Sequence, residues 1–394
     1  MNDTTPDRTT HATGTLRRLA ARLRRGLARP PLAETLDLSA SEVARDPFPH
    51  YEALRRTGSV HRLARHDFWI VLGYDDVRAA LARPQLFSSR VEDWQAVDSV
   101  LLGADPPEHT AARRLVTPYF SAEAVHAQAE FAGRAAERLL APLSSGAALD
   151  VLRDFSSPLA EEVAAHLVGF DAETLAAIRG LRGEARDVVG WLAALDSVIG
   201  RDAARIRMYG ELMRAGGGRL AEREARSLIR MLWIAGTTTT RRAIASSVLM
   251  LLRHPAQRAA IEHDPALVPA LVEESIRLHP PEHLLARVAA REVEVGGVRV
   301  PAGAQVRLCM AAANRDPAHF ERPSELLLGR APNPHLSFGG GIHRCVGAGL
   351  ARVEAEAAIR ALLRLAPRFR PPRPLDTLDF AGFANDTEEL LIEC

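Results

Sequence analysis

The spacing of apolar and polar positions predicts a mainly helical protein with a small β region. PFPHYEALRR (47–56) and DDVRAALARP (75–84) have the apolar spacing of short helices, and the proline that ends the second would stop it. Two apolar runs in VHRLARHDFWIVLGY have the length of strands. From DPPEHTAARRLVTPYF to Leu278 the apolar residues keep helical spacing, apart from a break at RAGGGR (214–219).

The C-terminal part of the chain adds the remaining strands. VEVGGVRVPAGAQVRLCM alternates and contains a Gly-Gly pair, which predicts a hairpin, and FRPP and ELLIEC are the last strand candidates. Residues 91–104 have no regular pattern and are predicted to form a long loop. Since no linker or repeat divides the chain, we predict one helix-rich domain over residues 46–394, preceded by a basic N-terminal extension over residues 1–45.

The N-terminal extension contains TLRRLAARLRRGLARPP, in which leucines share one helical face and arginines occupy the rest. This pattern fits either a solvated, flexible extension or a helix that binds an anionic surface or a partner.

Composition narrows the class of protein. The 394 residues are 47% hydrophobic and 25% charged, which is typical of a globular protein large enough to enclose a large ligand. A net charge of +1 gives no overall attraction to nucleic acid. Three scattered cysteines do not form a disulfide framework, and the chain has no signal-like or membrane-spanning apolar run, so we expect a cytoplasmic protein without a transmembrane segment.

One of the cysteines lies in an unusual loop, HLSFGGGIHRCVGAGLARVE. Three consecutive glycines would let the main chain pass closely under a flat ligand. Cys345 precedes a helix-forming run, so its sulfur would lie at a helix N-terminus, where the macrodipole favours a thiolate, and His343 and Arg344 would add positive charge. With no second sulfur nearby, this thiolate suits the axial position of a metal.

The loop resembles the haem-binding loop of the cytochrome P450 family, FGxGxHxCxG followed by LARxE. The resemblance implies a triangular, helix-rich single domain that holds haem b between a long distal helix and the cysteine loop, with Cys345 as the iron ligand. Cys309 and Cys394 have no comparable context. The matching residues are Phe338, Gly339, Gly341, His343, Cys345, Gly347, Leu350, Ala351, Arg352 and Glu354.

Two further motifs match the same family. Glu274 and Arg277 in EESIRLHPP correspond to its ExxR pair, which the resemblance completes with Arg330. DPPEHTAARR matches the stretch that binds the haem propionates, which need cationic partners when buried. The resemblance assigns cofactor contacts to Cys345, His109, Arg113, Arg287, His343, Phe338, Gly339 and Gly347.

The distal helix departs from the family pattern. MLWIAGTTTTRRAIASS aligns with AGx[DE]T, but Thr238 stands where the family has an acid, while the alcohol is kept as Thr239. We expect Thr238 and Thr239 to be catalytic residues. Three explanations of the missing acid compete: a rearranged water chain that uses both threonines, a proton group brought by the substrate, or direct use of peroxide. Arg241 and Arg242 follow, either as outward-facing charges or as contacts for an anionic or carrier-borne substrate.

A short middle region predicts a reduced lid. Only about 60 residues separate HLVGFDAET from WIAGTTTT, which implies an open entrance and a bulky substrate, such as a peptide or a group tethered to a carrier. Position relative to family landmarks suggests substrate contacts, each of which could equally be a core residue. These are Trp94, Trp233, Ile234, Leu284, Leu285 and Phe383.

The expected activity follows from the resemblance. No flavin or nicotinamide fingerprint is present, so electrons would come from a ferredoxin and a ferredoxin reductase, with Arg344 and Arg352 available to dock an acidic partner. We expect a monooxygenase that activates O2 to hydroxylate or epoxidise a small-molecule or peptide substrate in natural-product biosynthesis. The alternatives are oxidative C–C, C–O or C–N coupling of a peptide or carrier-bound substrate, and a non-catalytic haem-binding protein.

Overall fold

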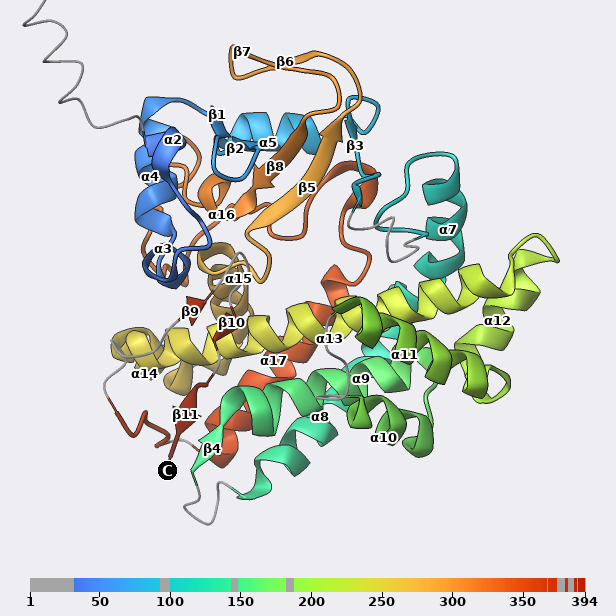
Figure 1. The fold of residues 1–394 in the computed structure, drawn as a ribbon. Helices are drawn as coiled ribbons and strands as arrows, with labels where there is room; N and C mark the ends of the chain where they lie inside the picture. The colour runs from blue at the N-terminus through green and yellow to red at the C-terminus, as the bar shows by residue number, and fades with distance from the viewer. Residues whose placement is uncertain are drawn as a thin grey trace, which may run out of the picture.

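The computed structural model describes residues 32–92, 100–142, 148–181, 188–366, 368–373, 380–381, 386–387 and 389–393. The arginine-rich segment before residue 32, Trp94, Phe383 and Cys394 lie outside the described residues. The prediction of a mainly helical protein with a small β region is confirmed (Figure 1). Its α-helices are α2 (Leu32–Thr35), α3 (Ser41–Arg45), α4 (Phe48–Thr57), α5 (Tyr74–Leu81), α7 (Glu108–Val116), α8 (Ala122–Leu140), α9 (Ser157–Val168), α10 (Ala172–Gly180), α11 (Val188–Asp202), α12 (Arg207–Gly216), α13 (Glu222–Arg253), α14 (Pro255–His263), α15 (Val268–Leu278), α16 (Met310–Ala313) and α17 (Ala348–Leu365).

A five-stranded sheet has the order β1-β2-β8-β5-β3. Strands β2 and β8 are parallel, and the other neighbours are antiparallel. The predicted hairpin is confirmed as β6 and β7, joined by two glycines with φ of 55° and 77°, a conformation that costs glycine little. The strands are β1 (Val60–Leu63), β2 (Phe68–Val71), β3 (Phe87–Ser88), β4 (Leu149–Asp150), β5 (Leu284–Ala289), β6 (Val293–Val295), β7 (Val298–Val300), β8 (Gln305–Cys309), β9 (Phe380–Ala381), β10 (Asp386–Thr387) and β11 (Leu391–Ile392).

The chain is already packed upstream of residue 46. Leu36, Leu38 and Val43 are buried in a hydrophobic cluster with Tyr51, and the Leu38 N–H donates to Nε2 of His66 at 2.9 Å. Residues 32–45, which the sequence assigns to the N-terminal extension, thus pack against the sheet region.

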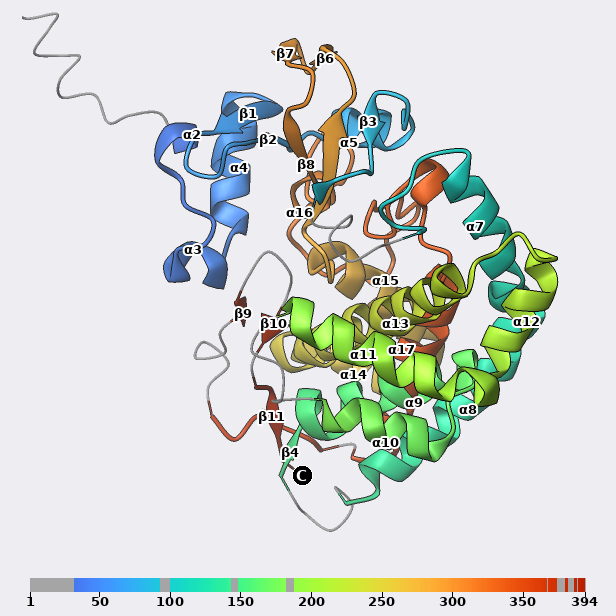
Figure 2. The same ribbon diagram turned by 45° about the vertical axis from the view of Figure 1, so that its right-hand side comes forward.

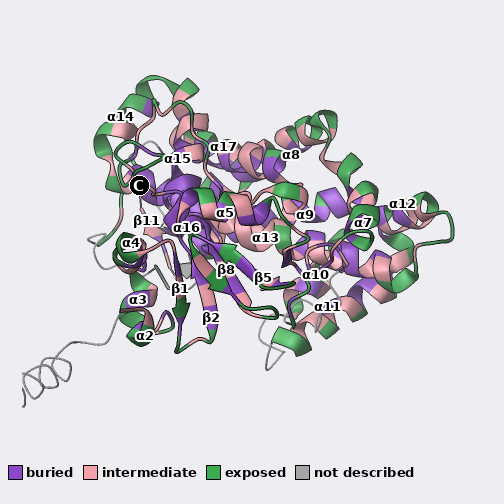
Figure 3. Ribbon diagram, turned by 90° about the horizontal axis from the view of Figure 1, so that it is seen from above, coloured by how far each residue is buried: buried purple, intermediate pink, exposed green. Residues whose placement is uncertain are grey.

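Helix α13 runs through the middle of the molecule. Figures 1 and 2 show the sheet and α4 on one side of it and α8 to α11 on the other. Its 32 residues contribute much of the largest core, where they meet apolar faces of α9, α15 and α17. In Figure 3 the buried residues gather along these interior faces, and exposed residues lie on outer elements such as α12 and α14. This burial stabilises the helix and fixes which of its faces each neighbour meets.

Among the helices in the described ranges, none is both long and apolar enough to span a bilayer.

Candidate active site at the cysteine loop

A tight loop brings Cys345 to the start of α17. The Cys345 N–H donates to the Phe338 carbonyl at 2.8 Å, and the Gly339 N–H donates to the Leu336 carbonyl at 2.8 Å. Helix α17 then begins at Ala348, directly after Gly347. The sulfur is thus held by backbone bonds that do not depend on any ligand.

The glycines of this loop meet helix α5 as well as the site. Gly341 has φ of 60°, and a Cβ there would lie 2.2 Å from the Leu81 carbonyl oxygen. A Cβ on Gly340 would lie 3.2 Å from the Leu81 side chain. Close packing on the end of α5 therefore requires glycine at positions 340 and 341. Sequence analysis did not identify this reason for the glycines. Gly339, with φ of 66°, lies instead beside Leu285, whose Cδ1 is 3.6 Å from where its Cβ would be.

The surroundings of Cys345 act on the pKa of its thiol in opposite directions. The side chain is exposed, yet burial by the surrounding protein raises the pKa of its thiol, as for a group at the bottom of a recess. The Gly347 N–H and the charges of Arg113, Arg352 and Arg344 act in the other direction and favour the thiolate. A cation bound to the sulfur would stabilise the thiolate further.

Four side chains that sequence analysis assigned to the propionates come together beside the loop. The rings of His109 and His343 lie 4.2 Å apart, and Arg113 and Arg287 act electrostatically on His343. Burial lowers the pKa of Arg287 to about 10, a value at which it is still charged near pH 7. Asp105 is the carboxylate that faces the group, and it accepts hydrogen bonds from Ser88 and Ser89.

His343 was expected to add positive charge, and this expectation is wrong. Burial, followed by the charge of Arg287, lowers its pKa to about 3, so the ring is neutral near pH 7. Its Nε2 makes a 2.9 Å hydrogen bond with Ser89 Oγ. No local signal singled out Ser89, which lies 254 positions away in the sequence.

The donor set fits haem. His109 is 2% exposed, and neither of its ring nitrogens has a hydrogen-bond partner among the described residues. A buried polar group in this condition is normally satisfied by a ligand or water. Haem carries two carboxylates and an iron that needs a ligand. The site offers two guanidinium cations and an unsatisfied imidazole for the carboxylates, and an accessible sulfur for the iron.

The threonines of α13 bond to their own helix. The hydroxyls of Thr238 and Thr239 donate to the carbonyls of Ile234 and Ala235 at 2.8 and 2.7 Å, and Thr237 does the same to Trp233 at 2.9 Å. Each hydroxyl has one hydrogen, so the two predicted catalytic groups can only accept a further hydrogen bond in this arrangement. Ala235, in the middle of this core helix, is nevertheless exposed.

The predicted substrate contacts fall in different surroundings. Trp233 is only 3% exposed and its ring centroid lies 5.3 Å from that of Phe170, so its side chain packs in the core. Successive helical residues point about 100° apart, so Trp233 and its neighbour Ile234 do not face the same space. Ile234, Leu284 and Leu285 are partly buried against the cores.

The expected ion pairs form beneath the site. Arg277 Nε and Nη2 donate to the two Glu274 oxygens at 2.6 and 2.9 Å, and Arg330 Nε donates to Glu274 at 3.0 Å. Arg277 also donates to backbone carbonyls of Asn314, Pro323 and Glu325. This network fixes α15 against the segment that leads into the cysteine loop.

A second network, missed by sequence analysis, reaches the loop from the same helix. Glu273 binds Arg352 through both carboxylate oxygens at 2.5 and 3.1 Å and His335 at 3.1 Å, and these partners lower its pKa to about 2 against the effect of burial. Arg352 lies over the ring of Phe338. The first glutamate of EESIR was the available signal, but its partners are distant in sequence.

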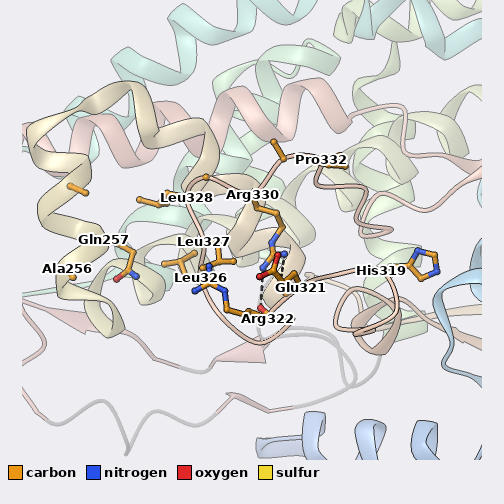
Figure 4. A pocket seen from close by; sticks show the side chains of 13 residues that line it. Ala256, Gln257, His319, Glu321, Arg322, Leu326, Leu327, Leu328, Arg330 and Pro332 are labelled. Atoms are coloured by element: carbon orange, nitrogen blue, oxygen red, sulfur yellow. Dashed lines mark hydrogen bonds between the residues drawn. The ribbon is translucent and has the colours of Figure 1, made fainter.

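The groove shown in Figure 4 is separate from this site. It has a volume of about 670 Å³ and is lined by α14 residues and by the segment from His319 to Pro332. Arg330, which belongs to the ion-pair network, is the one predicted site residue on its wall.

Comparison with known proteins agrees with the geometry. The family model for cytochrome P450 matches residues 193–372. The cytochrome P450 monooxygenase PikC of Streptomyces venezuelae is 34% identical over 378 residues, which span 86% of this chain and 88% of that protein. The structure of P450BioI in complex with an acyl carrier protein that bears hexadec-9Z-enoic acid superposes with a TM-score of 0.81 at 28% identity, covering 90% and 100% of the two chains. HmtN, a post-tailoring hydroxylase involved in himastatin biosynthesis, superposes with a TM-score of 0.79 at 30% identity, covering 88% and 97%.

These matches extend over most of the chain and include the cysteine loop, the ExxR pair and the long distal helix. They decide against the non-catalytic alternative, because the relatives are monooxygenases and hydroxylases. The chain therefore belongs to the cytochrome P450 family and is a haem-dependent monooxygenase.

Proposed function

We propose that this protein binds haem b through the Cys345 thiolate, which would hold the iron, and oxidises an organic substrate in natural-product biosynthesis. The observation that carries the proposal is the accessible sulfur at the start of α17, beside a cluster of cations with an unsatisfied histidine. Haem bound there would supply dioxygen activation, which a thiolate ligand promotes.

The chain's own residues would hold the cofactor and orient a water molecule beside it. Arg113, Arg287 and His109 would bind the propionates, with neutral His343 as a hydrogen-bonding neighbour. The Gly347 N–H would donate to the sulfur and moderate its charge. Thr239, whose hydroxyl oxygen can still accept a hydrogen bond, would orient a water molecule on the distal side.

The substrate class is inferred from the relatives. HmtN acts in himastatin biosynthesis, and P450BioI was solved with an acyl chain on a carrier protein, so a peptide or carrier-bound substrate is the class to test first. Electrons would come from a ferredoxin and its reductase, and the cytoplasmic location stays a prediction. Glu273 already pairs with Arg352, so Arg344 is the better candidate for docking the acidic partner.

Oxidative coupling is the second candidate. Thr238 replaces the usual acid, and its hydroxyl donates to the helix backbone, so delivery of protons for oxygen insertion is the step in question. Joining two substrate radicals removes two hydrogens and inserts no oxygen.

The test is spectroscopic and then chemical. The haem-loaded protein should give the thiolate-type Soret band in its reduced carbon monoxide adduct, and Cys345→Ser should lose it. Cys309→Ser is the matched control, since Cys309 is buried in another cluster and should leave the band unchanged. A histidine-type band in the parent protein would refute the proposal. With surrogate ferredoxin and reductase, a product heavier by one oxygen supports monooxygenation, and one lighter by two hydrogens supports coupling.

A further inference from the structure

An ion pair joins the distal helix α13 to the segment between α15 and β5. Nη1 of Arg242 donates to Oε1 of Glu282 at 2.7 Å, and the two side chains are 11% and 42% exposed. Because Arg242 is shielded, this pair is weakened by solvent and salt less than a pair of surface charges. Glu282 is therefore held in place while part of its side chain stays in contact with water.

Arg242 lies on the helical face that carries the two catalytic threonines. It follows Thr238 by four residues and Thr239 by three within α13, so its side chain points between theirs, about 40° around the helix from Thr238 and about 60° from Thr239. The position where the family has an acid is thus one turn from a guanidinium that binds a carboxylate from another segment. Arg242 is not the outward-facing surface charge that was one of its two expected roles.

The segment that carries Glu282 leads into β5, and residues of β5 lie beside the cysteine loop. Leu285, three residues further on, lies against Gly339, and Arg287 belongs to the cation cluster. Asp196, another carboxylate that pairs with α13, binds Arg226 and Arg230, two turns or more before Thr238. Glu282 is therefore nearer than Asp196 to the threonines and the cysteine loop, and is the better candidate for proton transfer between them.

We propose that Glu282 replaces the acid that is absent at position 238, and that Arg242 is the positioning residue that holds it. This inference rests on the proposed function, in which haem lies between α13 and the cysteine loop. This proposal explains two features together: the absence of the family's acid at Thr238 and the presence of Arg242 after the threonines. An acid brought from outside the helix needs a cation on the helix to fix its place.

The proton transfer balances without any further reactant. The Glu282 carboxylate takes a proton from bulk water through its exposed side and gives it to a water molecule that donates to the Thr239 hydroxyl oxygen. That water molecule passes one of its own protons to the oxygen that is being reduced, so it ends as neutral water. The carboxylate returns to its starting state, and the guanidinium keeps its charge throughout, since arginine does not deprotonate in this range.

Cyanide and azide binding to the ferric haem-loaded protein test this role without a substrate. Cyanide is present near pH 7 as HCN and must give up its proton on binding, whereas azide binds as an anion. Glu282→Gln should slow cyanide binding by roughly tenfold or more, as loss of a positioned proton acceptor does. Azide binding should stay the same or become faster, because the variant removes a negative charge.

Four further variants make the test more specific. Thr238→Asp in the Glu282→Gln background should restore the cyanide rate, since it returns an acid to the helix. Arg242→Gln should slow cyanide binding by a smaller factor than Glu282→Gln, and the double variant should be no slower than Glu282→Gln alone. Glu294→Gln, on the exposed hairpin, should change neither rate.

The outcomes separate this inference from the proposed function. Equal or faster cyanide binding in Glu282→Gln, with a thiolate-type spectrum intact, overturns the role of Glu282 and leaves the family function standing. A fall in both cyanide and azide rates also overturns it, because a structural change would then explain both. Absence of haem binding in the parent protein overturns the proposed function itself.

Discussion

The guanidinium carbon of Arg352 lies 4.3 Å from the centre of the Phe338 ring, and Phe338 supplies the carbonyl that binds the Cys345 N–H. Glu273 holds Arg352 in this place and is ionised, with its pKa lowered to about 2. A paired positive and negative charge thus lies beside the loop that presents the sulfur. The two charges should act on the haem in opposite directions.

Variants of this pair should shift the reduction potential with opposite signs. Glu273→Gln keeps one of the two acceptor oxygens and removes a negative charge, so the potential should rise, by the equivalent of about 1 kcal/mol. Arg352→Met should lower it by a similar amount, and the double variant should return close to the parent. Spectroelectrochemical titration measures all three. Shifts of the same sign in both single variants would indicate structural disruption instead.

The buried Glu274–Arg277 pair should be essential for stability. The side chains are 2% and 0% exposed, so Glu274→Ala leaves a buried cation without its partner and should lower the free energy of unfolding by about 3–5 kcal/mol. Glu325→Gln breaks an exposed pair with Arg322 and should cost less than about 1 kcal/mol. Urea unfolding of both variants makes the comparison, and equal losses would contradict it.

Gly341 should not accept a side chain. Gly341→Ala combines a left-handed backbone with a Cβ 2.2 Å from the Leu81 carbonyl oxygen, so it should destabilise the protein by about 2 kcal/mol or more and reduce haem retention. Gly329→Ala is the control, because no atom lies within 4 Å of its Cβ position. Thermal unfolding and haem content measure both effects. Unchanged behaviour of Gly341→Ala would show that the loop can move away from α5.

Acid should destabilise the protein through buried His279. Burial, and then the charge of Arg315, lowers the pKa of His279 well below its usual 6.5, so the unfolded chain binds a proton that the folded chain does not. The contribution of this group is complete above about pH 7 and is lost as pH falls below 6.5, with a slope of up to about 1.4 kcal/mol per pH unit.

His279→Gln should therefore flatten the dependence of unfolding free energy on pH between about 7 and 5. His263→Gln changes an exposed histidine and should keep the parent slope. Urea unfolding across this pH range measures the slopes, and an unchanged slope in His279→Gln would show that other groups dominate.

Much of the fold could be predicted because its signals are local. Apolar spacing predicted α4 and α5, since a helix that packs on a core needs one apolar face, and the family resemblance predicted the long helix α13. The Gly-Gly pair predicted the hairpin, since it permits the positive φ angles of a two-residue turn. The loop around Cys345 was recognisable because its fixed spacing is short and continuous in sequence.

Contacts between distant segments could not be predicted in the same way. The bond between Ser89 and His343 joins residues 254 positions apart, and the bond between Arg242 and Glu282 joins residues 40 positions apart. The residues around each of these positions do not indicate which distant residue it will bind. The charge state of His343 was misjudged for the same reason, because burial by neighbouring segments decides it.

The sequence by itself determined the family and predicted the cysteine and the ExxR ion pair, because these depend on which residue types follow one another along the chain. The tertiary structure alone decided that Trp233 faces the core, that two glycines serve the contact with α5, and that Glu282 lies against the distal helix. The physical reason is that burial, charge and the direction of a side chain depend on neighbours that packing brings together, and short sequence patterns do not specify those neighbours.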